Sequence, residues 1–303
     1  MAKLRRNHAP RGSAASGKTI AKVGVFGAIL AALVYAFQLF SGGGAGAAGE
    51  GVTYDGADYY LPTGGRGEIV RHRGFTLSYD EEWEQAEWVA YLLEGDNLRR
   101  EWTKRNDDFR PDPSVSTASA EDYDYRGSGY DRGHLAPFAD FAYDAELAAE
   151  TFYLSNISPQ ARQFNQGVWR ELEELTRDWA EDNDRLYVVT GPVMTEDPKG
   201  SIGRRNRVAV PAAYFKVLLD LEGNDRKAIG FIIPNEVSFD PLTRYAYSVD
   251  EVEQIVNLDF FAELMPDDLE ASLEADGNID FWRFDRRKFD KRVGEWNRRA
   301  ANR

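Results

Sequence analysis

The sequence predicts an α+β protein, and three observations favour this class. Apolar segments typical of strands recur between residues 151 and 234, a helical pattern interrupts them at 165–181, and a further helical pattern follows at 249–264. These elements do not alternate as regular βαβ units, which argues against a parallel α/β sheet. Of the 303 residues, 43% are hydrophobic and 13% are aromatic, which is enough to build a packed core.

The N-terminal region has its own composition. Residues 23–40 contain no charge, and at eighteen residues they approach the minimum length of a membrane-spanning helix. Six cations precede this run, which by the positive-inside rule places the N-terminus in the cytoplasm. We therefore expect a cytoplasmic basic segment at 1–22, a transmembrane anchor at 23–40 and a Gly/Ala-rich linker at 41–66. The protein would be membrane-anchored and single-pass, with its C-terminal domain on the extracytoplasmic side. The alternative is a signal peptide, and cleavage of residues 1–49 would give a secreted protein.

Charge and cysteine content exclude several classes of function. The whole chain has a net charge of −14, and residues 1–49 carry six cations and no acid, so the remainder sits at −20. So acidic a chain is unlike proteins that coat nucleic acid tightly and without sequence preference, because that binding needs many cations. Local contact with a few phosphates is still permitted. The chain has no cysteine, so disulfides, thiolate nucleophiles and cysteine-ligated zinc are excluded.

The elements of the folded part follow in order. Residues 68–79 alternate in part like a half-buried strand, and 81–93 fit either a helix or a buried strand. A long surface loop is expected at 105–128, because Asp, Pro, Ser and Gly are dense there. A strand at 151–157 should end at Ser158-Pro159. The further expected strands cover 185–194, 208–210, 213–221 and 227–234. A basic C-terminal tail is expected at 286–303, either as a nucleic-acid contact or as a solvated helix or frayed end.

Histidine is scarce, which narrows the choice of a general base. Apart from the N-terminal His8, the chain has only His72 and His134. His134 lies two residues from Arg132, and on a strand such residues share a face, so a guanidinium could hold phosphate beside the imidazole. The strand-like context of His72 favours a structural role. His134 is therefore the preferred base.

The helix at 165–181 carries the second half of the expected site. Four apolar residues at helical spacing form one buried stripe: Val168, Leu172, Leu175 and Trp179. Asn165 lies at the edge of the stripe, and Glu173 lies about 12 Å further along the axis, so both are unsuited to ligate one ion directly. A hard cation such as Mg²⁺ accepts one amide oxygen together with waters and phosphate. The plain alternative is that Asn165 is a helix N-cap.

Three ordered blocks carry a resemblance. They are Tyr130-Asp131-Arg132-Gly133-His134-Leu135-Ala136-Pro137, Tyr153-Leu154-Ser155-Asn156-Ile157-Ser158-Pro159-Gln160 and Asn165-Gln166-Gly167-Val168-Trp169-Arg170-Glu171-Leu172-Glu173. Together they resemble the non-specific DNA/RNA endonuclease family, which includes endonuclease G, over roughly residues 70–282. The resemblance implies a ββα-metal (His-Me finger) fold with a central antiparallel sheet. It also implies an endonuclease domain at 67–285.

The resemblance further implies the roles of individual residues. His134 would activate water, Asn165 would be the direct protein ligand of Mg²⁺, with Mn²⁺ as the alternative ion, and Glu173 would bind the metal through water. Arg132 and Arg177 would stabilise charge on the phosphorane, and Asn156 would support the site or the substrate. A loop arginine is also expected, for which Arg105 is the better match and Arg110 the rival. Asp131 is interpreted as structural.

These implications lead to one expected function and two alternatives. The expected protein is a Mg²⁺-dependent, sugar-non-specific endonuclease that cleaves DNA and RNA to 5′-phosphorylated products. One alternative is a catalytically inactive, nuclease-like binding module for anionic ligands, and the other is a small-nucleotide phosphodiesterase. DNA and RNA are the expected partners, together with the membrane through residues 23–40. The sequence leaves open whether the protein forms a homodimer.

Overall fold

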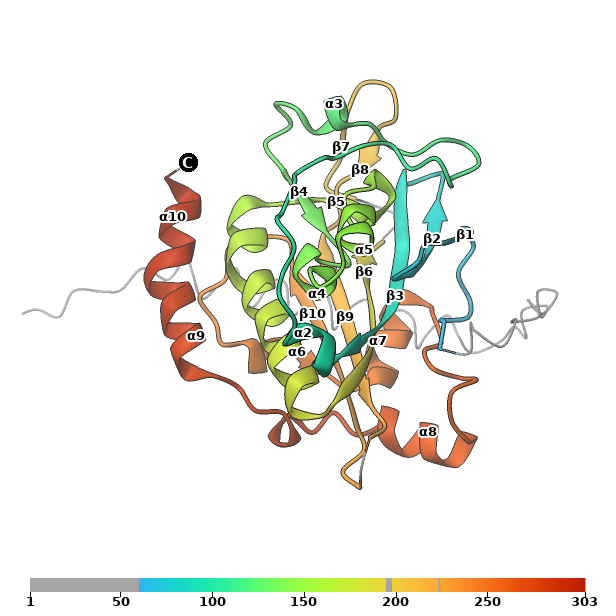
Figure 1. Cartoon of the computed structure of the whole chain (residues 1–303), viewed down its shortest axis with the longest axis vertical. Helices are drawn as coiled ribbons and strands as arrows, with labels where there is room; N and C mark the ends of the chain where they lie inside the picture. Colours follow the sequence, from blue (N-terminus) through green and yellow to red (C-terminus); the bar gives the residue numbers. More distant parts are fainter. Residues whose placement is uncertain (1–59, 195–197, 223, 303) are drawn as a thin grey trace, which may run out of the picture. The chain divides into compact units, whose positions relative to one another are not determined.

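The computed structural model describes residues 60–194, 198–222 and 224–302. Its main feature is a seven-stranded sheet in which every neighbouring pair is antiparallel (Figure 1). In spatial order the strands are β1 (Glu68–Arg71), β2 (Thr76–Asp80), β3 (Gln85–Glu94), β6 (Arg185–Val193), β9 (Ala213–Asp220), β10 (Lys227–Pro234) and β11 (Ala246–Tyr247). The antiparallel α+β class expected from the sequence is confirmed. The ambiguous stretch at 81–93 is largely a strand.

Both faces of the sheet are covered. Along β9, Tyr214 and Leu218 point into one hydrophobic cluster, which α6 (Arg170–Asp182) completes. Phe215 and Val217 point into the opposite cluster, which α7 (Val249–Val256) completes. Because both faces are buried, the strands are apolar nearly throughout. The predicted stripe on α6 faces this core, since Val168, Leu172, Leu175 and Trp179 are all at most 2% exposed.

A second, two-stranded sheet carries the first sequence block. Antiparallel strands β4 (Asp131–His134) and β5 (Ile157–Gln160) pair Arg132 with Pro159 and His134 with Ile157. Gly133 is required there, because a Cβ would lie 2.1 Å from the Gln160 side chain. The helical stretch η2 (Phe164–Trp169) follows β5 and continues into α6. The order is therefore strand, strand, helix.

The strand expected at 151–157 is wrong. That stretch forms turns and the 3₁₀ turn η1 (Leu154–Asn156), and the strand begins only at Ile157 and runs through Ser158-Pro159. The Asn156 side chain explains the shift, since it bonds the backbone of Ala136 and Thr151 and holds the chain in a turn. Proline is accepted in β5 because this strand has only one partner and needs no N–H on its free side.

Further short elements lie between these strands and after them, and two of them, the strands Ser201–Ile202 and Val208–Ala209, pair as a third sheet. The short elements are α2 (Gly95–Leu98), α3 (Asp122–Tyr125), α4 (Phe138–Phe141), α5 (Ala145–Glu150), β7 (Ser201–Ile202), β8 (Val208–Ala209), η3 (Leu242–Tyr245), α8 (Asp267–Glu274), η4 (Ile279–Phe281), α9 (Arg286–Lys291), η5 (Arg292–Trp296) and α10 (Asn297–Ala301). Apart from α3 and one isolated bridge, the stretch at 105–128 is irregular, as expected of a loop.

The basic C-terminal segment is helical and packs onto the domain. Arg292 is fully buried, and its Nε donates to Glu171 of α6 at 2.6 Å. Asn297 is 3% exposed, and its side chain lies against Gly167 of η2, where a Cβ would lie 2.5 Å from Asn297 Oδ1. Residues 286–302 therefore buttress the helix that carries Asn165, in addition to presenting cations at the surface.

The expected basic N-terminus at 1–22, the anchor at 23–40 and most of the linker at 41–66 lie outside the described residues. Among the helices of residues 60–194, 198–222 and 224–302, none has both the length and the apolar character needed to cross a membrane.

Candidate active site

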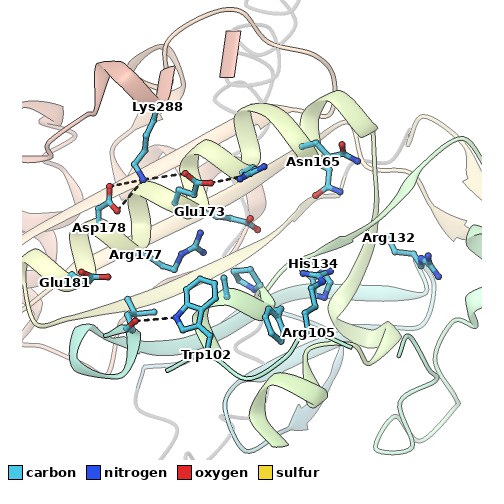
Figure 2. A pocket seen from close by; sticks show the side chains of 17 residues that line it. Trp102, Arg105, Arg132, His134, Asn165, Glu173, Arg177, Asp178, Glu181 and Lys288 are labelled. Atoms are coloured by element: carbon cyan, nitrogen blue, oxygen red, sulfur yellow. Dashed lines mark hydrogen bonds and ion pairs between the residues drawn. The ribbon is translucent and has the colours of Figure 1, made fainter. Parts of the chain in front are cut away.

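A groove runs between α6 and the β4–β5 sheet. Its first part, here called the α6 cavity, has a volume of about 600 Å³ and is shown in Figure 2. Six of the residues expected from the sequence line it: Arg105, Arg132, His134, Asn165, Glu173 and Arg177. In Figure 2, Asn165, Glu173 and Arg177 lie on the helical side and His134 and Arg105 lie across from them.

The groove continues beyond the α6 cavity. A second cavity of about 830 Å³, here called the β4 cavity, shares Arg105, Arg132, Asn165 and Gln166 with the first. A surface that extends past the candidate catalytic residues has room for more than one unit of a polymeric substrate. Its arginines suit the phosphates of such a polymer.

His134 ends strand β4 in an aromatic setting. Its ring meets Phe152 edge-on at 5.1 Å and Phe109 at 5.6 Å, and its Nε2 is buried without a hydrogen-bond partner among the described residues. Burial, together with the charges of Arg105 and Arg132, lowers the pKa of His134 to about 3. The imidazole is therefore neutral at neutral pH, which is the form able to accept a proton.

Asn165 is oriented by a carboxylate. Its Nδ2 donates to Asp131 Oδ2 at 3.2 Å, and because a carboxylate only accepts, the amide nitrogen must face Asp131. This leaves Oδ1, the atom that can bind a cation, turned away from Asp131. Gln166 Nε2 and Arg162 Nε also donate to Asp131, at 2.9 and 3.0 Å, which fixes the carboxylate in turn. Asp131 thus makes the structural contacts expected of it.

The helix begins earlier than the sequence indicated. Residues 162 and 163 are already helical, and the N–H of Asn165 donates to the carbonyl of Ala161, so Asn165 lies inside the first turns and is not an N-cap. The stretch from Phe164 to Trp169 has π-helical hydrogen bonding and is kinked at Gly167, whose φ of −115° and ψ of −107° are not helical. Single π turns within helices occur often at functional sites.

Glu173 faces the same cavity two turns later. Burial raises the pKa of Glu173, whereas the nearby charges of Arg177 and Lys216 lower it. Lys216 lies on β9 and is fully buried, with Nζ 5.2 Å from the centre of the Trp169 ring and without a hydrogen-bond partner among the described residues. A buried cation in this position favours the ionised form of the neighbouring carboxylate, but the effect of burial is larger and the pKa of Glu173 is raised to about 7.

Sequence reasoning missed Lys216. A lysine within the otherwise apolar run Ala213–Leu219 was a signal that could have been followed, since lysine is rarely buried without a charged partner. It was overlooked because strand periodicity alone does not say which helix a side chain will meet.

Arg177 is held by a buried network. Its Nη1 donates to Asp140 at 2.8 Å, and Asp140 also accepts a hydrogen bond of 2.7 Å from the hydroxyl of Tyr91. The side chain of Arg177 is only 14% exposed, so its position is well defined at the wall of the cavity. Asp140 and Tyr91 were not foreseen as supports.

The two candidate loop arginines, Arg105 and Arg110, lie in different places relative to the groove. Arg105 lines both cavities and stacks over Phe152 at 5.2 Å, with Asp107 as an exposed ion-pair partner. Its rival Arg110 lines neither cavity and stacks over Tyr153 at 4.2 Å. Placement therefore favours Arg105 as the loop arginine.

Two further expected residues occupy different positions. Asn156 is fully buried and does not line the groove; its Oδ1 accepts the N–H of Ala136 at 2.9 Å and its Nδ2 donates to the Ala136 carbonyl at 2.9 Å. Asn156 thus fixes the turn that follows His134. His72 is buried outside the groove, with Nε2 2.9 Å from Asp112 Oδ2, which agrees with the structural role expected of it.

Comparison with known proteins places this geometry in context. The family described as DNA/RNA non-specific endonuclease matches residues 55–267. Human endonuclease G, mitochondrial, is 34% identical over 221 residues, covering 69% of this chain and 74% of that protein. Human nuclease EXOG, mitochondrial, is 34% identical over 267 residues, covering 80% and 71%. A crystal structure of the EndoG/EndoGI complex, concerned with the mechanism of EndoG inhibition, is similar with a TM-score of 0.63, 27% identity and coverage of 71% of this chain and 95% of that chain.

The expected localisation requires correction. A single-pass, membrane-anchored protein with an extracytoplasmic domain was predicted, but this prediction is wrong, because the relatives above are mitochondrial nucleases. The membrane is likewise unsupported as a partner. An uncharged run preceded by cations is a pattern that targeting segments share with anchors, so it did not determine the location.

Proposed function

Because the chain belongs to the DNA/RNA non-specific endonuclease family, and is therefore a nuclease that hydrolyses phosphodiester bonds, we propose a Mg²⁺-dependent, sugar-non-specific endonuclease that leaves 5′-phosphorylated products. The resemblance seen in the sequence is thus confirmed at the level of the family. One observation carries the finer proposal: a neutral, buried His134 faces, across one groove, an Asn165 whose amide oxygen is left available by Asp131.

The oxygen donors of the α6 cavity fit a small hard cation. Asn165 would bind the ion directly through Oδ1, and Glu173 would hold part of its hydration shell, which suits Mg²⁺ because this ion keeps several waters. Mn²⁺ is the alternative. The bound ion would supply Lewis acidity at a phosphate oxygen and offset the charge of the leaving 3′ oxygen. Endonucleases resembling endonuclease G depend on a metal in general, which agrees with this donor set.

Protein side chains would position and polarise the phosphate. Arg132 and Arg105 lie beside His134 at the junction of the two cavities, and Arg177 lies further along α6. Guanidinium groups bind phosphate oxygens bidentately, and their attraction grows as negative charge develops on the pentacovalent phosphorus. Asn156 would act as a positioning residue, because it holds the turn after His134 and does not reach the groove.

His134 would accept the proton of the attacking water. In the free protein its pKa is lowered to about 3, and besides burial the causes are the positive charges of Arg105 and Arg132. A phosphate bound between these arginines offsets both charges, so the imidazole becomes a stronger base when the substrate arrives. This coupling would confine efficient proton transfer to the substrate complex.

The test is cleavage of supercoiled plasmid DNA and of a structured RNA by the purified protein. Both substrates should be cleaved with Mg²⁺, neither with excess EDTA, and activity should return when Mg²⁺ is restored. Binding of both polymers without cleavage under any metal condition would establish the inactive binding module instead. Cleavage of a dinucleotide analogue that plasmid DNA fails to inhibit would establish the small-nucleotide phosphodiesterase.

A further inference from the structure

An acidic cluster lies on the sheet face opposite α6, apart from the groove. Asp250 and Glu253 belong to α7 and Glu274 is the last residue of α8; both helices are orange in Figure 1. One oxygen from each of the three side chains lies within 4.8 Å of the others. Clusters of acids are common at protein surfaces, so proximity alone does not make a site.

The environment of Glu274 distinguishes this cluster. Glu274 is 4% exposed, and its Oε1 is buried without a hydrogen-bond partner among the described residues. A buried carboxylate oxygen without a partner is costly. Burial has the largest effect on the pKa of Glu274, and the neighbouring acids Glu253, Glu270, Asp250 and Asp259 follow in that order. Burial and these charges together raise the pKa to about 9. Its place at the C-terminal end of α8 adds the unfavourable end of a helix dipole.

The backbone holds this carboxylate against α7. Gly277 lies so close to Ser248, the N-cap residue of α7, that a Cβ would be 2.9 Å from the Ser248 nitrogen. Glu253 is fixed as well, because its Oε1 accepts the N–H of Phe260 at 2.8 Å, which leaves its other oxygen for a further partner. The three carboxylates are thus brought together by tight packing on both sides.

We propose that Asp250, Glu253 and Glu274 bind a divalent cation of the Ca²⁺ class, which joins α8 to α7. Only oxygen ligands are present, as hard cations require. The three oxygens all lie within 4.8 Å of one another, close enough for one ion to contact them together. Ca²⁺ accepts carboxylates in flexible geometry, with waters completing its coordination, whereas Mg²⁺ demands a near-ideal octahedron.

This cation site is independent of the proposed catalytic ion and is tested without measuring activity. The Asn165→Ala variant removes the direct ligand proposed in the groove, so binding elsewhere can be observed. In this background, Ca²⁺ at about 10 mM should raise the melting temperature by roughly 3–10 °C over NaCl of equal ionic strength, for a dissociation constant of about 10⁻⁴ to 10⁻³ M. Calorimetric titration with CaCl₂ should give a stoichiometry of one.

Matched variants decide whether the three acids are the ligands. Glu274→Gln and Glu253→Gln in the same background should each abolish the Ca²⁺-dependent rise. Glu270→Gln removes an equal charge from the same neighbourhood without removing a ligand, and it should keep the rise. The proposal is overturned if Ca²⁺ gives no rise beyond matched NaCl, or if the rise persists in both ligand variants.

Discussion

Arg292→Met tests whether the basic C-terminal segment supports the domain. The side chain of Arg292 is fully buried; Nε donates to Glu171 at 2.6 Å, Nη1 to the Ser238 carbonyl at 2.7 Å and Nη2 to the Asp240 carbonyl at 2.6 Å. Methionine fills much of the volume but makes none of these bonds, and Glu171 is left as an unpaired buried acid. Breaking a buried ion pair from one side costs about 3–5 kcal/mol of unfolding free energy.

The assay is thermal unfolding followed by circular dichroism. A loss of about 3–5 kcal/mol corresponds to a melting temperature lower by about 6–20 °C for a domain of this size. The deficit should shrink toward low pH. Burial already raises the pKa of Glu171 above its ordinary value, and without Arg292 the pKa rises further, so protonation as pH falls through that pKa removes the unpaired charge. Arg287→Met is the matched control, since its side chain is 91% exposed, and it should be nearly neutral. A deficit no larger than that of Arg287→Met would refute the reasoning.

Two further predictions concern the groove. Asp131→Ala should weaken the apparent Mg²⁺ affinity in cleavage by about 10- to 100-fold, because the amide of Asn165 loses the partner that orients it. Arg162→Ala removes only one of the further donors to Asp131 and should have a smaller effect; equal effects of the two substitutions would count against the idea. Lys216→Met removes a positive charge that lowers the pKa of Glu173, so the acid limb of the rate–pH profile should move to higher pH. The rate at pH 9 should change little, and an unshifted profile would contradict this role of Lys216.

The sequence predicted the parts of the fold that depend on local patterns. The stripe from Val168 to Trp179 was correct because 3.6-residue periodicity reports directly on which face of a helix is buried. The stretch at 81–93 could not be assigned, since Trp88 and Ala90 enter one core and Val89 and Tyr91 enter the other. A strand buried on both faces is apolar throughout and carries no period.

Residues in contact across the chain were harder to foresee. Arg292 lies 121 residues from Glu171, so nothing in the local sequence shows that this arginine is buried while Arg287 is exposed. The strand error at 151–157 has the same origin, because Asn156 bonds a turn twenty residues earlier. By contrast, the clustering of His134 and Asn165 was predictable, since both belong to sequence blocks that a known family keeps in order.

The proposed mechanism depends most on His134 as the base. Single-turnover cleavage of plasmid DNA and of RNA by His134→Ala, with the melting temperature and substrate affinity measured on the same preparation, tests this directly. We expect a rate lower by about 10²- to 10⁴-fold on both substrates, with a cooperative melting transition and substrate binding retained. An undiminished cleavage rate in this variant would contradict it.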